Sequence, residues 1–396
     1  MNRRILALLL VLVMVAGLMT GCASGRQEAA APETAQPESP AAEETAAEPE
    51  QTEDSPAEEE APAEPETVSF TDSLGRTVEL PADITRIAPS GAVATMILAA
   101  IAPECMVTIN TAPSESQMAF LPANLAALPE TGQMHGGKAD LNLETLLAAD
   151  PQVVIDLGDK KGDMTEDLDA LQEQIGIPVI FIEADLPHMA EAFRTLGGLL
   201  SGKSDRGEEL AALVDRTTAI AEENAAKITD DMRVRAMYTT GEDGLGTNAA
   251  GSMQAQVLDM VGVENAVVVE DVSNKGGGNI ISLEQLYNFD PDVILFADGS
   301  IYDTVAGDSA WSQLTAISTG KYYEVPGSPY SWLSGPPSMN MILGVWWLGN
   351  LIYPEIYDYD METMTQELYK TLWGYELSSE EVTALLGNST LKAAAQ

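Results

Sequence analysis

The sequence is poor in histidine and cysteine. Its 396 residues include two of each, namely His135, His188, Cys22 and Cys105. A protein site for a bare zinc ion draws on several histidine or cysteine side chains, so a multi-histidine site is excluded. If Cys22 is modified, as argued below, Cys105 has no partner for an intramolecular disulfide.

The chain also lacks the short motifs of common catalytic and nucleotide-binding sites. It contains no GxSxG, no Walker A loop and no HExxH. Asp150 and Asp290 each precede a proline, where they are expected to end helices and not to form an acid–base pair. The sequence therefore predicts a protein that is not an enzyme and holds no resident cofactor or metal.

Basic residues are scarce. The chain has 19 lysines and arginines against 62 acidic residues, for a net charge of −43. Only 14 of the acidic residues lie between residues 23 and 67, so the rest of the chain is strongly acidic too. Such a field repels nucleic acid and anionic headgroups, which excludes nucleic-acid binding.

The amino terminus has the features of a targeting segment. Arg3 and Arg4 precede an apolar run from Ile5 to Met19, shorter than the ~20 residues of a membrane span. The run leads into Gly21-Cys22 and resembles the bacterial lipobox, with Met19 where leucine is usual. We expect residues 1–22 to be a lipoprotein signal peptide, with the mature chain anchored through Cys22 on the extracytoplasmic face of the cell membrane. An ordinary secretory signal is the alternative.

Residues 23–67 consist mainly of alanine, glutamate, proline, threonine and serine. A segment with so few bulky apolar side chains cannot bury enough surface to offset its ordering entropy. We predict a disordered acidic tether, held extended by charge repulsion and proline. Binding of a basic partner by the acidic run is the alternative.

One segment of the sequence occurs twice. Residues 143–155 (LETLLAADPQVVI) return 140 positions later as residues 283–295 (LEQLYNFDPDVIL). The same offset relates His135-Gly136-Gly137 to Lys275-Gly276-Gly277. Each copy predicts a short helix that ends at Asp-Pro, followed by a buried strand. The copies are too far apart for a solenoid, so we expect equivalent elements in two similar α/β lobes. A chance match is the alternative.

A long helix is predicted between the two copies. Residues 204–228 contain no proline, and apolar residues recur at helical spacing. At ~1.5 Å per residue the helix would span on the order of 35 Å, enough to connect two lobes. This divides the chain into a first lobe (68–203), a connecting helix (204–228) and a second lobe (229–396). An ordinary surface helix is the alternative.

The first lobe opens with a predicted β-hairpin over residues 68–81, where apolar and polar residues alternate around Leu74-Gly75-Arg76. A short strand at 84–88 and a helix from Ala92 to Ala102 follow. Together with later segments, this opening carries a family resemblance. The segments are Asp72–Arg76, Ile84–Pro89, Gly320–Pro326, Leu343–Leu348 and Tyr353-Pro354-Glu355.

In their order, these segments resemble the substrate-binding proteins that serve iron-siderophore, haem and cobalamin ABC importers. The resemblance implies an α/β fold with two Rossmann-like lobes joined by one long α-helix, and a ligand cleft between the lobes. It also implies an ABC permease and its ATPase as partners. In this family, glutamates on the tips of the lobes meet arginines of the permease. Many surface glutamates qualify here.

Ligands of open α/β sheets bind beyond the carboxyl ends of the strands. A role only as turns is the alternative for each of the loops at these positions, and a solvated corner is the alternative for Lys160-Lys161. On this rule the ligand-binding candidates are Ser90, Gly91, Asn110, Met134, His135 and Lys160 in the first lobe, and Tyr238, Thr240, Asp243, Lys275, Tyr302, Tyr330 and Trp332 in the second.

Residues 328–337 form a loop with three prolines and two aromatic residues. Such a loop is stiff, and tyrosine and tryptophan supply a large contact area with little entropy lost on binding. We therefore expect Trp332 to contact the ligand. Packing of Trp332 against the last helices is the alternative.

Few arginines fall in the predicted ligand loops. Anionic ligands are commonly held by arginine clusters, so the sequence favours a neutral or weakly charged metal chelate, such as a ferric hydroxamate or a corrinoid. The other siderophores and haem stay open. An oxyanion such as molybdate is a rival ligand, with Lys160, Lys161, Lys275 and His135 around it. A rival function is that of a two-lobe lipoprotein acting as a sensor or surface interaction module.

Overall fold

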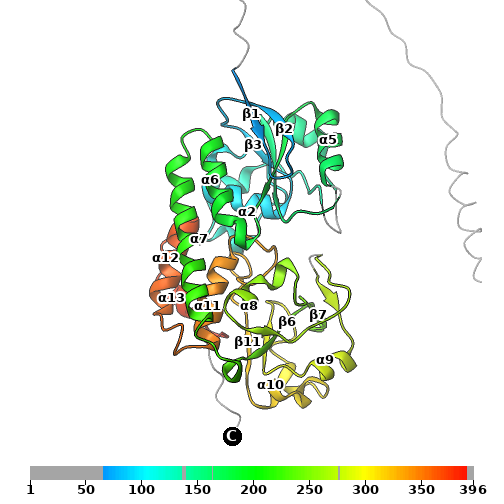
Figure 1. Ribbon diagram of the computed structural model, residues 1–396, viewed down its shortest axis with the longest axis vertical. Coiled ribbons are helices and arrows are strands. Elements are labelled where there is room, and N and C mark those ends of the chain that lie inside the picture. Colours follow the sequence, from blue (N-terminus) through cyan, green and yellow to red (C-terminus); the bar gives the residue numbers. More distant parts are fainter. Residues whose placement is uncertain (1–65, 136–139, 163, 275–276, 390–396) are drawn as a thin grey trace, which may run out of the picture. The chain divides into compact units, whose positions relative to one another are not determined.

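The computed structural model describes residues 66–135, 140–162, 164–274 and 277–389, and Figure 1 colours them along the sequence. These residues belong to the unit Pro62–Gln396. The predicted signal peptide, Cys22, almost all of the predicted tether and Lys275 lie outside the described residues. So do Gly136, Gly137 and Gly276 of the repeated sequence.

The first lobe begins with the predicted β-hairpin. Strands β1 (Thr67–Thr71) and β2 (Thr77–Pro81) pair antiparallel, with Phe70 opposite Val78. Asp72 closes the turn, because its carboxylate accepts hydrogen bonds from the backbone of Leu74 and Arg76 and pairs with the Arg76 guanidinium at 3.0 Å. The hairpin prediction is thus confirmed.

A three-stranded parallel sheet forms the centre of the first lobe, in the order β3-β4-β5. The middle strand is buried along its whole length, as expected for a parallel sheet covered on both faces. Isolated β-bridges pair Ile87 with Met106 and Ile109 with Glu130. The elements are β3 (Ile87–Pro89), α2 (Ala92–Ile101), α3 (Glu115–Met118), α4 (Leu143–Ala148), β4 (Val153–Gly158), α5 (Met164–Ile175), β5 (Val179–Glu183) and α6 (Met189–Leu199).

The second lobe repeats this plan around a larger sheet. Its strands follow the order β11-β10-β6-β7-β9, and β8 also pairs with β6. Strands β6, β10, β11 and β8 run parallel, whereas β7 and β9 are antiparallel additions. The elements are β6 (Arg235–Thr240), β7 (Gly246–Thr247), α8 (Gln256–Met260), β8 (Glu264–Asn265), β9 (Asn279–Ile280), α9 (Leu283–Phe289), β10 (Val293–Phe296), α10 (Thr315–Ser318) and β11 (Tyr322–Glu324).

The two copies of the repeated sequence occupy equivalent places, as α4 with β4 and as α9 with β10. Both residues before proline leave the right-handed helical region, as predicted, but they do so in the left-handed region, with φ of 51° at Asp150 and 32° at Asp290. In each lobe an arginine from the preceding segment donates to the carbonyl of that aspartate. The distances are 2.8 Å from Arg86 Nε and 3.3 Å from Arg235 Nη1.

Helix α7 (Ser204–Ala225) leads from the first lobe to the second (Figure 1). It ends three residues before the predicted end at Ile228, because residues 226–228 form tighter turns: Ile228 N–H donates to the Ala225 carbonyl, three residues back, at 3.1 Å. Residues Gly197 of α6 and Gly207 of α7 face each other where these helices cross. A Cβ at Gly207 would clash with the backbone of α6, and one at Gly197 would lie only 3.0 Å from the Gly207 Cα, so the close crossing requires glycine at position 207.

The C-terminal helices also join the lobes. They are α11 (Met341–Ile352), α12 (Met361–Trp373) and α13 (Ser379–Leu385), drawn in orange and red beside α7 in Figure 1. The Arg206 guanidinium of α7 donates to the carbonyls of Ala100 in α2 and Thr371 in α12, at 2.9 and 2.6 Å. The rings of Phe120 and Tyr369 meet edge to face at 5.6 Å. The chain crosses from lobe to lobe along α7, but α12 reinforces that connection.

One apolar core runs from the first sheet through α7 to α11 and α12. Short 3₁₀ helices form several of the connections between elements. No helix in the described part of the chain is long and apolar enough to cross a membrane. The 3₁₀ helices are η1 (Pro103–Cys105), η2 (Ala123–Ala127), η3 (Leu186–His188), η4 (Asp230–Met232), η5 (Met253–Ala255), η6 (Val305–Gly307) and η7 (Trp311–Gln313).

Candidate functional site

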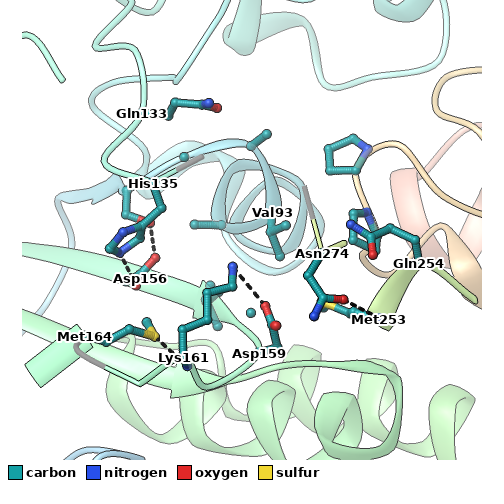
Figure 2. A pocket seen from close by; sticks show the side chains of 18 of the residues that line it. Val93, Gln133, His135, Asp156, Asp159, Lys161, Met164, Met253, Gln254 and Asn274 are labelled. Atoms are coloured by element: carbon teal, nitrogen blue, oxygen red, sulfur yellow. Dashed lines mark hydrogen bonds and ion pairs between the residues drawn. The ribbon is translucent and has the colours of Figure 1, made fainter. Parts of the chain in front are cut away.

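A cavity of about 630 Å³ lies at the carboxyl ends of β3 and β4, lined by residues from both lobes. Figure 2 shows His135, Asp156, Lys161 and Asp159 of the first lobe on one side, with Asn274, Met253 and Gln254 of the second lobe on the other. The first lobe contributes Ser90–Ala94, Gln133, His135, Asp156–Asp159, Lys161, Met164 and Phe181. The second contributes Met253, Gln254, Asn274, Gly277 and Ser334–Pro337.

The order of the strands explains why these loops meet. Because β3 and β4 are parallel neighbours, the residues that follow them emerge at the same edge of the sheet. Ser90 follows β3 directly, and its N–H donates to the Ile155 carbonyl of β4 at 3.1 Å. Helix α2 then begins at the cavity wall with Gly91 as its N-cap, and no side chain caps it. Its first backbone N–H groups lack intrahelical acceptors and suit an acceptor atom of a ligand.

A buried carboxylate organises one wall of the cavity. Asp156 projects from β4 with only 4% of its surface exposed. One of its oxygens accepts a hydrogen bond from the buried Ser90 hydroxyl, and the other lies 3.2 Å from His135 Nε2. The three side chains therefore form a hydrogen-bonded chain with the aspartate in the middle, between the serine and the histidine. Since the serine donates to the carboxylate and not to the imidazole, histidine does not activate it as a nucleophile.

The contact with Asp156 also sets the charge of His135. The hydrogen bond to this carboxylate raises the pKa of the imidazole, and partial burial opposes the rise. The charge of Asp156 adds to the increase, as does that of Asp167 in α5, whereas Lys161 works against it. The imidazolium form is therefore favoured to a higher pH than in a free histidine.

The second cation at the cavity is also paired with a carboxylate. Lys161 Nζ lies 3.1 Å from Asp159, and the Lys161 backbone N–H donates to the Met164 sulfur at 3.1 Å. Both cationic side chains that the structure places on the lining thus have an acidic partner, and no arginine is among the described lining residues. Lys160, the predicted neighbour, pairs with Glu183 of β5 at 2.9 Å and does not line the cavity.

The wall from the second lobe is mainly apolar and amide-bearing. Asn274 accepts a hydrogen bond from the Met253 backbone N–H at 3.1 Å, which holds the two segments together. The proline-rich loop supplies Ser334 to Pro337, so it reaches the cavity. It contributes prolines there and not its aromatic rings.

Trp332 is the clearest departure from the predicted site. Its side chain is fully buried, its indole N–H donates to the Ser328 carbonyl at 3.3 Å, and its ring lies 6.4 Å from that of Tyr369 in α12. It packs against a C-terminal helix, which was the alternative interpretation of the sequence. Tryptophan has the area to complete an apolar core, and here that demand determines its place.

Of the predicted site residues, Ser90, Gly91 and His135 line the cavity. Tyr238 is buried, and its hydroxyl lies 3.3 Å from that of Ser331. Tyr330 is also largely buried, which raises the pKa of its hydroxyl to about 12. Lys275 lies outside the described residues. The lining does not include Asn110, Met134, Lys160, Tyr238, Thr240, Asp243, Tyr302, Tyr330 or Trp332.

Several lining residues were not predicted. Asp156 has a recognisable signal, because it is the one charged residue in the apolar run from Val153 to Leu157, and a buried charge needs a partner. Gln133 and Asn274 have no such signal in the sequence. They reach the cavity through the folding of long loops.

With this geometry in place, comparison with known proteins identifies the family. The sequence profile of the periplasmic binding proteins matches residues 94–329, more than half of the chain. The chain belongs to the periplasmic binding protein family. No curated protein sequence matches it. The resemblance found in the sequence is confirmed, as are the two-lobe α/β fold and the absence of an enzymatic role.

Three solved binding proteins are similar in structure. An ABC transporter solute-binding protein of Sulfurospirillum deleyianum is 29% identical, with a TM-score of 0.74 and 81% of this chain and 99% of that chain covered. A periplasmic solute-binding protein of Veillonella parvula is 24% identical (TM-score 0.68, coverage 82% and 98%). MolA of Haemophilus influenzae, solved with molybdate, is 20% identical (0.65, 78% and 99%). The chain is thus a non-enzymatic, extracytoplasmic solute-binding protein of the ABC-transporter type.

Proposed function

We propose that this periplasmic binding protein captures a compact metal chelate and delivers it to an ABC importer. The carrying observation is the cavity of about 630 Å³ at the carboxyl ends of β3 and β4, lined from both lobes. Small-molecule sites in proteins have volumes of roughly 300–1,000 Å³. A ligand of this size would contact both lobes at once.

The volume of the cavity argues against a small oxyanion or a free metal ion as the ligand. A tetrahedral oxyanion displaces only a few water molecules of ~30 Å³ each, so it would leave most of the cavity to solvent. In the described part of the chain, moreover, no group of three or more histidine, cysteine, aspartate or glutamate side chains is placed to hold a metal ion. A chelate that brings its own donor atoms needs neither feature from the protein.

The charges on the wall favour a ligand of low net charge. His135 and Lys161 are each paired with a carboxylate, so neither offers a full unpaired charge to an anion. The remaining lining combines apolar side chains with amides and hydroxyls that can donate or accept. A neutral or weakly charged chelate, such as a ferric hydroxamate or a corrinoid, matches this mixture, and the other siderophores and haem belong to the same test.

The oxyanion remains the second candidate because one feature favours it. The uncapped amino terminus of α2 opens on the cavity, and helix amino termini bind anions through their free N–H groups and dipole. MolA, which shares the fold, was solved with molybdate. A ligand screen separates the two candidates.

We further propose that the protein is lipid-anchored through Cys22 and works beside a permease and its ATPase. The lipobox-like sequence before Cys22 supports the anchor, and the acidic segment that follows would let the folded body reach its permease. A sensor or surface interaction module on the same two-lobe frame is the rival. It would bind ligand without a cognate importer, so adjacent permease and ATPase genes would argue against it.

Thermal-shift measurements with ferric hydroxamates, ferric catecholates, haem, cobalamin, molybdate and free divalent metals test the ligand class. A ligand that binds only folded protein stabilises it by about 2.7 kcal/mol at ~100 times its dissociation constant. We expect a chelate to stabilise the protein. Stabilisation confined to molybdate or to a free metal ion would refute the chelate assignment.

Two matched variants locate the binding. Val93 lines the cavity, and Val68 lies 45% exposed on the β1 strand, away from it. Val93→Trp fills the cavity and should abolish the chelate-induced shift, whereas Val68→Trp should leave it intact. Equal shifts in both variants would place the ligand elsewhere.

A further inference from the structure

Ser90, Asp156 and His135 form a hydrogen-bonded set of side chains on the cavity wall of the first lobe. Asp156 is buried and has both oxygens engaged, by the Ser90 hydroxyl and by His135 Nε2. The Met134 backbone N–H donates to the Ser90 carbonyl at 2.7 Å, which holds the base of the histidine loop against the end of β3. The imidazole is therefore held by Asp156, on a loop whose backbone is itself bonded to the residue after β3.

The other ring nitrogen of His135 makes no such contact with the part of the chain that the structure describes. The side chain is 28% exposed and lines the cavity, and Nδ1 has no hydrogen-bond partner among the described residues. Figure 2 shows the imidazole beside Asp156 on the wall of the first lobe. A ring held by a carboxylate through one nitrogen presents the other in a fixed direction.

Resting on the proposed function, we propose that His135 contacts the bound chelate and donates a hydrogen bond from Nδ1 to one of the chelate's oxygen atoms, and that Asp156 positions the ring for this contact. The ligand must then offer an acceptor oxygen at this wall. Hydroxamate, catecholate and carboxylate groups, which bind ferric iron through oxygen, meet that requirement. Oxygen-donor ferric chelates carry such oxygens at the iron itself, and we assign the ligand to this class.

This contact makes binding depend on pH in a defined direction. The charged ring donates from both nitrogens. The neutral ring keeps its single proton on Nε2, toward the Asp156 carboxylate, so that Nδ1 becomes an acceptor and repels an oxygen of the ligand. The hydrogen bond with Asp156 raises the pKa of His135, Asp167 reinforces the rise and Lys161 opposes it; Ser90 and Asp159 are the other polar groups nearby. Binding is therefore strong below the raised pKa and weakens as the pH rises through it.

Proton titration by NMR tests the positioning role without a ligand. The chain has two histidines, so His188→Gln leaves His135 as the only imidazole signal. We expect His135 to titrate above the ordinary value of ~6.5 in this background, and at or below it when Asp156→Asn is added, since burial alone lowers the pKa of histidine. A titration that Asp156→Asn does not change would overturn the proposal.

Tryptophan fluorescence with three probes tests the contact: ferric ferrichrome, ferric enterobactin and haem. We expect an oxygen-donor chelate to bind about tenfold more weakly at a pH of about 8.5 than at about 6, the effect of losing one hydrogen bond to a charged group. In His135→Gln this pH dependence should vanish, while binding persists at the weaker level.

The outcomes separate the two proposals. A ferric chelate that binds wild type and His135→Gln alike, with the same affinity at both pH values, refutes the histidine contact and leaves the chelate function standing. Selective binding of haem would refute the oxygen-donor class. Binding of none of the probes at either pH, together with no stabilisation by cobalamin in the thermal-shift screen, refutes the chelate function, and the inference falls with it.

Discussion

The crossing of α6 and α7 supports a quantitative prediction about stability. Gly207 of α7 is buried, and a Cβ at this position would lie 2.6 Å from the Phe193 carbonyl oxygen and 2.8 Å from the Gly197 Cα. Both atoms belong to the backbone of α6, so no side chain can rotate away to make room. Gly207→Ala must push the two helices apart where α7 is anchored to the first lobe.

The magnitude follows from two opposing contributions. Alanine is favoured over glycine in a helix interior by about 0.8–1.0 kcal/mol. Overpacking of a tight interior costs typically ~1–3 kcal/mol, and backbone atoms on both sides place this site toward the upper end. We expect Gly207→Ala to lower the free energy of unfolding by about 1–2 kcal/mol.

Gly198 provides the matched control. It lies in α6 next to Gly197 but is exposed, and a Cβ there meets no atom within 4 Å. Gly198→Ala should therefore show only the helix-propensity gain, up to about 1 kcal/mol. The two variants should differ by about 2–3 kcal/mol. With an unfolding entropy of ~2.1 cal/mol/K per residue, this difference corresponds to roughly 3–5 °C in Tm for a body of this size.

Differential scanning calorimetry of the two variants beside wild type measures this difference. If Gly207→Ala is as stable as Gly198→Ala, the close approach of the α6 and α7 backbones does not exist. If both variants lose stability, Gly198 does not lie in an open helical position, and the control fails.

Two further predictions concern Trp332 and Cys22. Trp332→Ala should lower the free energy of unfolding by about 3–5 kcal/mol, as for other large core residues, because the ring is fully buried beside Tyr369. At a temperature where the variant is folded, its chelate affinity should stay within a few-fold of wild type. A loss of affinity without a change in the urea midpoint of unfolding would instead place Trp332 in the binding site. Cys22→Ala should release the protein from the membrane fraction without changing ligand affinity, and unchanged fractionation would exclude the lipid anchor.

Local sequence patterns were sufficient to predict several of the individual elements. Alternation around Gly75 predicted the β1–β2 hairpin, and the run from Val153 to Ile155 predicted a buried strand. These features depend on neighbours a few residues away, through turn geometry and the periodicity of burial. The repeated segment extended this to the plan of two lobes, because two similar sequences fold into similar units.

The sequence was a poorer guide to side-chain direction within loops. Lys160 and Lys161 are adjacent in one predicted ligand loop, yet Lys161 lines the cavity whereas Lys160 turns to Glu183 of β5. Asp159, the partner of Lys161, lies in the same loop, but Glu183, the partner of Lys160, lies on β5 and comes within reach only after the sheet forms. No pattern within the loop contains that information.

The sequence by itself determined the α/β class, the two lobes, the long helix and the loops at the carboxyl ends of the strands, since these follow from periodicity, proline placement and repetition. Only the tertiary structure decided which residues of those loops face the ligand cavity. Trp332 packs in the core against α12, and Asp156 forms hydrogen bonds with Ser90 and His135, which come from segments far apart in the sequence. Both outcomes depend on long-range packing and on pairing a buried charge, which local residue patterns do not encode.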